Sequence, residues 1–308
     1  DMKLEIGYTG NKATIKDAFA KYTYKNHSIQ VGQFYEPFSL EMMCSTFDIR
    51  FNQSPGAVLA LTNGRRMGIT YSYRNKRHYM SGGAFMDNEV NNLKKASHGY
   101  ALDGRVVYRP VLDSKKLIHI GFAANYRTPN ESLNEEDKNI FIYKSPGVST
   151  IDNRNIAMAT IDHAAYQIKF GTELLVYYHR FCLQSEYIRT HVERDNAFKN
   201  YVAQGAYLQC SWLLSGETYL YDESVACAGR PEGKSLEVCS RFNYLTLNDE
   251  DAAILGGEQK DISIGLNYYI NKYIGIKLNY SYLIPGASIK EISRKNFSVF
   301  QGRFQFIF

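Results

Sequence analysis

Apolar and polar residues alternate with a period of two along most of the chain, and this pattern restricts the possible fold more than any other feature. In segment 296–308, Phe300 and Phe304 fall on one face. Gln301 and Arg303 fall on the other face. Successive side chains of a β-strand point to opposite faces, so the pattern predicts strands with one apolar and one polar face. About fourteen segments show it: 2–9, 14–24, 28–36, 66–74, 77–86, 99–109, 116–127, 164–178, 180–192, 200–213, 235–247, 259–270, 273–283 and 296–308.

The connections between these segments fit a barrel that crosses a membrane. Typical segments are long enough for a tilted strand to cross a bilayer, which takes about 9–11 residues. All seven prolines lie at segment ends or in connections, where a missing N–H does not interrupt a strand ladder. Short turns at one end and long loops at the other are typical of outer-membrane barrels. We expect short turns at 25–27, 75–76, 113–115 and 271–272, and long loops at 37–65, 128–163, 214–234 and 284–295.

A soluble β-sandwich would also alternate, so the residue types on each face must separate the two classes. The chain has 25 tyrosines and 17 phenylalanines, many of them on the apolar faces, as the aromatic girdles of a membrane barrel require. The opposite faces carry Lys, Arg, Glu and Gln, which suit a wet lumen better than a sandwich core. We therefore predict an all-β, antiparallel transmembrane β-barrel, a single domain over residues 1–308, integral to the outer membrane of a Gram-negative bacterium.

Several other functions find no support in the sequence. The net charge of +5 is too small to indicate a nucleic-acid partner. No G-x-S-x-G, H-E-x-x-H or P-loop pattern occurs, so we predict no enzyme activity, no catalytic residue and no cofactor. The five cysteines contain no C-x-x-C pair, which indicates no metal site and favours free thiols or one or two bridges.

Strand parity predicts which charged side chains face the lumen. The basic candidates are Lys21, Arg74, Arg105, Arg109, Arg127, Lys169, Arg241, Lys277 and Arg303. The acidic candidates are Glu5, Asp17, Asp103, Glu173, Glu186 and Glu237. The excess of bases predicts a mild preference for anions, and guanidinium groups suit phosphate because they bind it with two hydrogen bonds. The alternative is that each charge is simply solvated in a water-filled lumen.

Five stretches of the chain resemble one porin family. They are VGQFYEPFSLE at 31–41, KDAF at 16–19, GRRMG at 64–68, SWLLSGE at 211–217 and GGEQ at 256–259, together with the alternating phenylalanines at the C-terminus. The first is similar to the sequence VGQFKEPFSLE of the phosphate-selective porin O and P family. The resemblance covers about residues 12–308 and implies a trimeric, sixteen-stranded porin with a third loop folded inward. Two further strands and a signal peptide would then precede Asp1, and a fourteen-stranded barrel is the alternative.

The resemblance also directs attention to the loop that narrows the pore. Where the family has a basic residue that coordinates the anion, this chain has Phe47, with Asp48 beside it. Arg50, Arg65 and Arg66 are the candidates for the constriction and anion site, and a surface pair at the barrel rim is the alternative for the last two. We predict a porin for passive diffusion of small anions or other small hydrophilic solutes, surrounded by outer-membrane lipid. A plugged barrel that serves as a structural subunit among other envelope proteins is the alternative.

Overall fold

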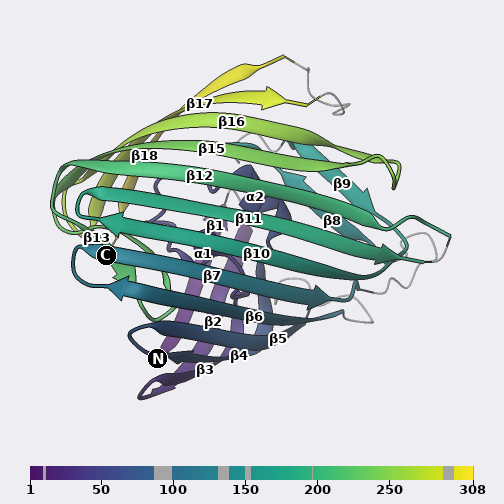
Figure 1. The fold of residues 1–308 in the computed structure, drawn as a ribbon, viewed down its shortest axis with the longest axis horizontal. Helices are drawn as coiled ribbons and strands as arrows, with labels where there is room; N and C mark the ends of the chain where they lie inside the picture. Colours follow the sequence, from purple (N-terminus) through teal and green to yellow (C-terminus); the bar gives the residue numbers. More distant parts are fainter. Residues whose placement is uncertain are drawn as a thin grey trace.

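The computed structural model describes residues 1–9, 12–86, 99–130, 139–149, 154–195, 197–286 and 295–307. Fourteen antiparallel strands form one sheet in which each strand is hydrogen-bonded to the next (Figure 1). They are β1 (Met2–Thr9), β2 (Lys12–Tyr24), β3 (His27–Tyr35), β4 (Arg65–Arg74), β5 (His78–Met86), β6 (Tyr100–Leu112), β7 (Lys116–Arg127), β10 (Ala164–Tyr178), β11 (Phe181–Arg194), β12 (Tyr201–Ser215), β15 (Ser235–Asp249), β16 (Ile254–Tyr269), β17 (Ile274–Pro285) and β18 (Phe297–Phe306). The alternation of residues therefore predicted the strands correctly, although Phe308 lies outside the described residues.

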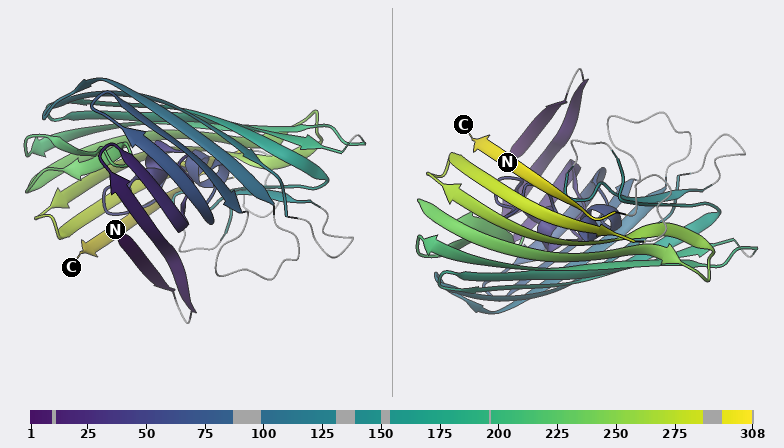
Figure 2. Two further views of the ribbon diagram at one scale, coloured as in Figure 1. Left: turned by 90° about the horizontal axis from the view of Figure 1, so that it is seen from below. Right: turned by 90° about the horizontal axis from the view of Figure 1, so that it is seen from above.

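Within the described residues, four strands and two short helices lie outside this sheet. The strands β8 (Phe141–Ser145) and β9 (Ala157–Ile161) pair with each other, as do β13 (Tyr219–Asp222) and β14 (Cys227–Pro231). The helices α1 (Leu40–Met43) and α2 (Gly56–Leu61) lie within the curve of the sheet (Figure 2). No helix in the described part of the chain is long and apolar enough to span a membrane.

The sheet curls into a barrel wall that is not closed by hydrogen bonds. Its two edge strands, β1 and β18, do not pair with each other within the described residues. The two edges lie on the same side of the molecule, with the N- and C-terminal ends near each other (Figure 2). The described wall therefore has fourteen strands, two fewer than the family resemblance implies.

Buried and exposed side chains alternate along the strands, but the polar ones are buried and the apolar ones exposed, which is the reverse of a soluble protein. On β17 the side chains of Lys277 and Asn279 are buried, whereas Ile276 and Leu278 are exposed. On β18 the ring of Phe300 is 72% exposed. Polar side chains thus face the interior and apolar ones face outward, which is stable only where lipid covers the outer surface.

The connections lie at the two ends of the wall largely as predicted. Short turns join β2 to β3, β4 to β5, β6 to β7 and β16 to β17 at one end. Connection 36–64 lies at the other end, as do the described parts of connections 128–163 and 286–296. The prediction that all long connections share one end is wrong for 214–234. Antiparallel strands alternate in direction, and β12 ends at the short-turn end of the wall. The connection that follows it, with its β13–β14 hairpin, therefore lies at that end.

Candidate functional site

Residues 36–64, which we call the lumen segment, fold into the barrel between β3 and β4. Helix α1 begins after Ser39, whose side-chain oxygen accepts a hydrogen bond from the Met42 N–H at 3.3 Å. Leu40, Val58 and Leu61 are fully buried and pack against inward-facing wall residues. The predicted inward fold of this loop is therefore confirmed.

Polar wall side chains hold the main chain of the lumen segment. The Glu186 carboxylate on β11 accepts hydrogen bonds from the N–H groups of Leu40 at 3.0 Å and Glu41 at 2.8 Å. Further hydrogen bonds come from Asn243 on β15, Asn267 on β16, and Lys277 and Asn279 on β17. Because buried main-chain groups need partners, these bonds fix the segment in one position.

Most of the predicted lumen-facing bases lie inside the barrel but are covered by inserted chain. Arg50, Arg105, Arg109, Arg127, Lys169, Arg241 and Lys277 are at most 3% exposed. Arg105 forms hydrogen bonds of 2.7 and 3.1 Å with the Glu173 carboxylate. It also donates to the carbonyl oxygens of Val225 and Ala226, each at 2.7 Å. Parity predicted the face of these residues, and the inserted segments use their charges as attachment points.

The other covered bases also bind inserted chain, and each has its own partner. Arg127 is paired with Glu36, and Lys169 donates to the side-chain oxygen of Asn63 at 2.9 Å. Arg241 donates to the Gln53 carbonyl at 2.9 Å. Arg109 lies 3.7 Å from the Glu223 carboxylate in the β13–β14 hairpin, and Lys277 donates to the carbonyl oxygens of Phe47 and Ile49. These positive charges therefore anchor inserted chain instead of facing open water.

Of the three predicted constriction residues, the structure places only Arg65 at the main cavity. Its guanidinium donates to Asp17 at 2.5 Å and to the Tyr35 hydroxyl at 2.9 Å. Arg66 is half-buried beside it and donates to the Arg65 carbonyl at 2.8 Å. Arg50 is buried elsewhere, with its Nε 3.4 Å from Glu237. The structure therefore does not bring the three arginines together.

Besides Lys21, which is half-buried at the main cavity, two predicted bases are less deeply buried. Arg74, at the end of β4, is half-buried. Arg303 on β18 donates to the carbonyl oxygen of Thr46 at 3.5 Å, so it too contacts the lumen segment. Neither residue lines the main cavity.

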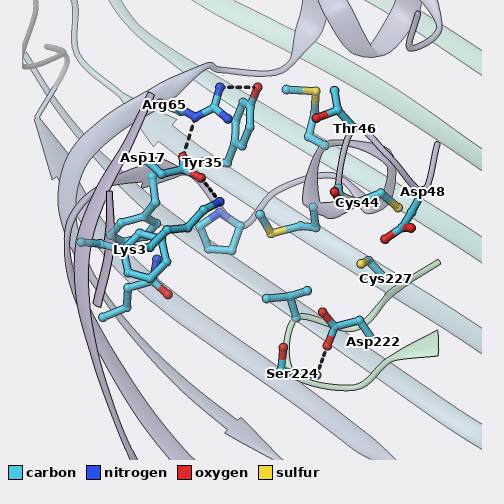
Figure 3. Close-up of a pocket in the computed structure, with 18 of the residues that line it drawn as sticks. Lys3, Asp17, Tyr35, Cys44, Thr46, Asp48, Arg65, Asp222, Ser224 and Cys227 are labelled. Atoms are coloured by element: carbon cyan, nitrogen blue, oxygen red, sulfur yellow. Dashed lines mark hydrogen bonds and ion pairs between the residues drawn. The ribbon is translucent and has the colours of Figure 1, made fainter. Parts of the chain in front are cut away.

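A cavity of about 780 Å³ lies between the β1–β4 wall, the lumen segment and the turn of the β13–β14 hairpin. Lys3, Asp17 and Arg65 lie on one side of it, and Asp48 and Asp222 lie on the other (Figure 3). Its lining includes the bases Lys3, Lys16, Lys21 and Arg65 and the acids Asp1, Glu5, Asp17, Glu41, Asp48 and Asp222. The cavity thus has charges of both signs, with more acids than bases. The sequence did not place Glu41 or Asp222 in the lumen, because no local pattern shows that their connections fold inward.

Two of these acids should make the cavity sensitive to pH. Burial raises the pKa of both Glu41 and Asp48 in the lumen segment. A carboxyl with a raised pKa becomes neutral at a pH at which ordinary carboxylates are still ionised. Lowering the pH is therefore expected to shift the zero-current potential of the protein in a planar bilayer toward anions, at a pH above the range in which ordinary carboxylates become neutral.

The variant Asp48→Asn should remove part of this pH-dependent shift. Glu250→Gln, in the β15–β16 turn away from the cavity, is the matched control and should leave the shift unchanged. An identical pH profile for Asp48→Asn and the unmodified protein would show that Asp48 does not face the conducting path.

A curved antiparallel wall with an apolar outer face and a charged lumen defines the class of outer-membrane β-barrels. Within that class, the chain belongs to the phosphate-selective porin O and P family, whose model matches residues 3–308. The protein is therefore an integral outer-membrane protein of Gram-negative bacteria.

Individual proteins are similar to this chain in sequence or in fold. An uncharacterized protein of Caulobacter vibrioides is 25% identical over 298 residues, which cover 91% of this chain and 58% of that protein. The chain thus spans little more than half the length of that relative. Outer-membrane expressed OmpT of Vibrio cholerae has a similar fold, with a TM-score of 0.56, 11% identity and coverage of 98% of this chain and 83% of OmpT. Pseudomonas putida OprB is similar with a TM-score of 0.54, 11% identity and coverage of 96% and 74%.

Proposed function

We propose that the protein is a channel through which small hydrophilic solutes diffuse passively across the outer membrane. The observation that carries this proposal is the charged cavity inside a polar lumen. Hydrated solutes can pass along such a surface without any chemical step, and charged rings in the lumen set their selectivity. Membership of a porin family supports a channel and not an enzyme.

In this proposal the wall of the constriction is built around Arg65. Its guanidinium is stacked on the Tyr35 ring at 4.1 Å and bonded to Asp17, which also accepts from Lys3 at 2.6 Å. This arrangement holds a charged group rigidly at the edge of the cavity. The Arg66 side chain supports Arg65 by donating a hydrogen bond to its main-chain carbonyl. Arg50 donates to the main-chain carbonyl of Asp48 and so helps to position the lumen segment.

We expect this channel to select only weakly between anions and cations. The β1–β4 wall carries both bases and acids, whereas the lumen segment and hairpin contribute only acids, so the field across the cavity would orient dipolar solutes. The mild anion preference suggested by the lumen-facing bases stays a prediction, because carboxylates and carbonyl oxygens already bind most of them. Phe47 lines the cavity where the family has its anion-coordinating base, which argues for a general channel and against phosphate binding.

The first test is the zero-current potential of the purified protein in a planar bilayer under a KCl gradient, followed by a phosphate titration. We expect steady ohmic channels with weak selectivity and no block by phosphate. Arg65→Ala should change the potential, whereas Arg189→Ala, on the outer face of β11, should not. Phe47→Lys restores a base at the family's position and tests whether phosphate block can be introduced. A strongly anion-selective potential with phosphate block of the unmodified protein would contradict the general channel.

A plugged barrel with a structural role is the second candidate. It is favoured by the many hydrogen bonds that fix the lumen segment and by the β13–β14 hairpin that covers the opposite end of the lumen. Folded protein that forms no channels would support this candidate over the first. Trimer formation, implied by the family, belongs to either proposal, and a trimer form of Vibrio cholerae OmpT has a similar fold with a TM-score of 0.57, 10% identity and coverage of 96% and 82%.

A further inference from the structure

Two cysteines from separate inserted segments lie side by side in the lumen. Cys44 follows helix α1 in the lumen segment, and Cys227 begins β14 in the hairpin. Helix α1 packs against β14, and both cysteines line the main cavity (Figure 3). Both side chains belong to one packed cluster, in which the half-buried Cys44 packs against buried residues that include Cys227. Both are free thiols in the structure.

We propose that Cys44 and Cys227 form a disulfide bond that ties the lumen segment to the β13–β14 hairpin. Because both side chains already pack in one cluster, bond formation requires that they reach the narrow range of disulfide geometry. The other three cysteines lie in different surroundings. Cys182 contacts Arg50, Cys239 contacts Asn267, and Cys210 is on the outward-facing side of β12.

The reaction is an ordinary thiol–disulfide exchange. The two thiols together lose two protons and two electrons as the new S–S bond forms. A disulfide-bonded oxidant, either a small molecule or a periplasmic protein, accepts them and leaves as two thiols. Outer-membrane proteins assemble through the periplasm, where such oxidation is favoured.

The bond would reinforce a contact that the two segments already make. Asp48 in the lumen segment lies 3.6 Å from Arg230 in β14, an ion pair that spans the same junction. The ion pair can break when either segment moves, whereas a disulfide holds the segments together until it is reduced. Oxidation would therefore lock the part of the cavity wall that the two segments build together.

The pH should control how fast the bond forms. The neighbouring Cys227 thiol and burial both raise the pKa of Cys44. Because the thiolate is the attacking species, formation should become faster as the pH rises.

The test is to oxidise the folded protein with diamide, unfold it, block the remaining thiols with a maleimide, and measure the mass of the chain. We expect two of the five thiols to be protected from the maleimide and to be recovered with dithiothreitol. Peptide mapping should identify a Cys44–Cys227 link.

Single variants make this assignment specific. Cys44→Ser and Cys227→Ser should each leave all four remaining thiols reactive, whereas Cys210→Ser should still lose two. Five reactive thiols after oxidation, or a link between other cysteines, would overturn the inference. Thiol counting requires no channel activity, so this inference and the proposed function are tested separately.

Discussion

Replacing Arg105 by alanine is expected to lower the free energy of unfolding by about 3–5 kcal/mol, the usual cost of removing one partner of a buried ion pair. The change leaves the Glu173 carboxylate buried without its bidentate partner. It also removes the donors that satisfy the Val225 and Ala226 carbonyl oxygens. His119 is 3.8 Å from Glu173, too far to replace those hydrogen bonds. The measurement is equilibrium unfolding in urea with lipid vesicles, followed by the fluorescence of Trp212, the only tryptophan.

Two matched variants separate the ion pair from a general effect of losing a cation. Arg180→Ala removes an exposed arginine in the β10–β11 turn and should change the free energy by no more than about 0.5 kcal/mol. Glu173→Gln should cost less than Arg105→Ala, because the amide oxygen still accepts a hydrogen bond and the hairpin carbonyls keep their donor. If the urea midpoint of Arg105→Ala equalled that of the Arg180→Ala control, the buried ion pair would not be a source of stability.

Removing the β13–β14 hairpin is expected to raise the conductance several-fold and to shift the channel toward anions. The hairpin is not part of the fourteen-stranded wall, so joining β12 to β15 by a short turn leaves the wall intact. Arg105 and Arg109 are completely buried and both contact the hairpin, so its removal would expose them to the lumen. Guanidinium groups stay charged at all relevant pH values and attract anions. Single-channel conductance and the zero-current potential under a KCl gradient measure the two effects.

A second substitution in the same deletion identifies the source of the shift. Arg109→Ala in the hairpin-deleted protein should reduce the anion preference and leave the enlarged conductance in place. In the intact protein Arg109 is covered, so a change there should have little influence on selectivity. An unchanged conductance after deletion would instead mean that the lumen segment alone limits the flow of ions.

The wall of this protein could be predicted almost entirely from sequence. Each membrane strand faces lipid on one side and water on the other. Apolar and polar residues therefore alternate along it, and this alternation is visible within a few consecutive residues. Side chains that parity assigns to the inner face, such as Arg105, Lys169 and Lys277, are buried in the structure. The inward fold of the loop after β3 came from the family resemblance.

The contents of the lumen could not be predicted in the same way. Parity gives the face of Arg105 but not the hairpin carbonyls that cover it, since those come from about 120 residues further along the chain. Arg50 and Arg65 looked like members of one constriction because they are close in sequence. In the structure Arg50 is drawn to Glu237 on β15 and Arg65 to Asp17 on β2. The proximity of Cys44 and Cys227 could not be predicted either, because the two cysteines belong to different inserted segments.

The attachment of the lumen segment also sets an order of events during folding. Its main-chain bonds to Glu186, Asn243 and Asn279 join residues separated by 145 to 227 positions. The segment leaves the ribosome early, yet its partners are made much later and are in place only once β11 to β17 have assembled. Contacts between such distant residues form slowly, because the intervening chain must first be ordered. Filling of the lumen is therefore a late step, and until then the lumen is less obstructed than in the mature protein.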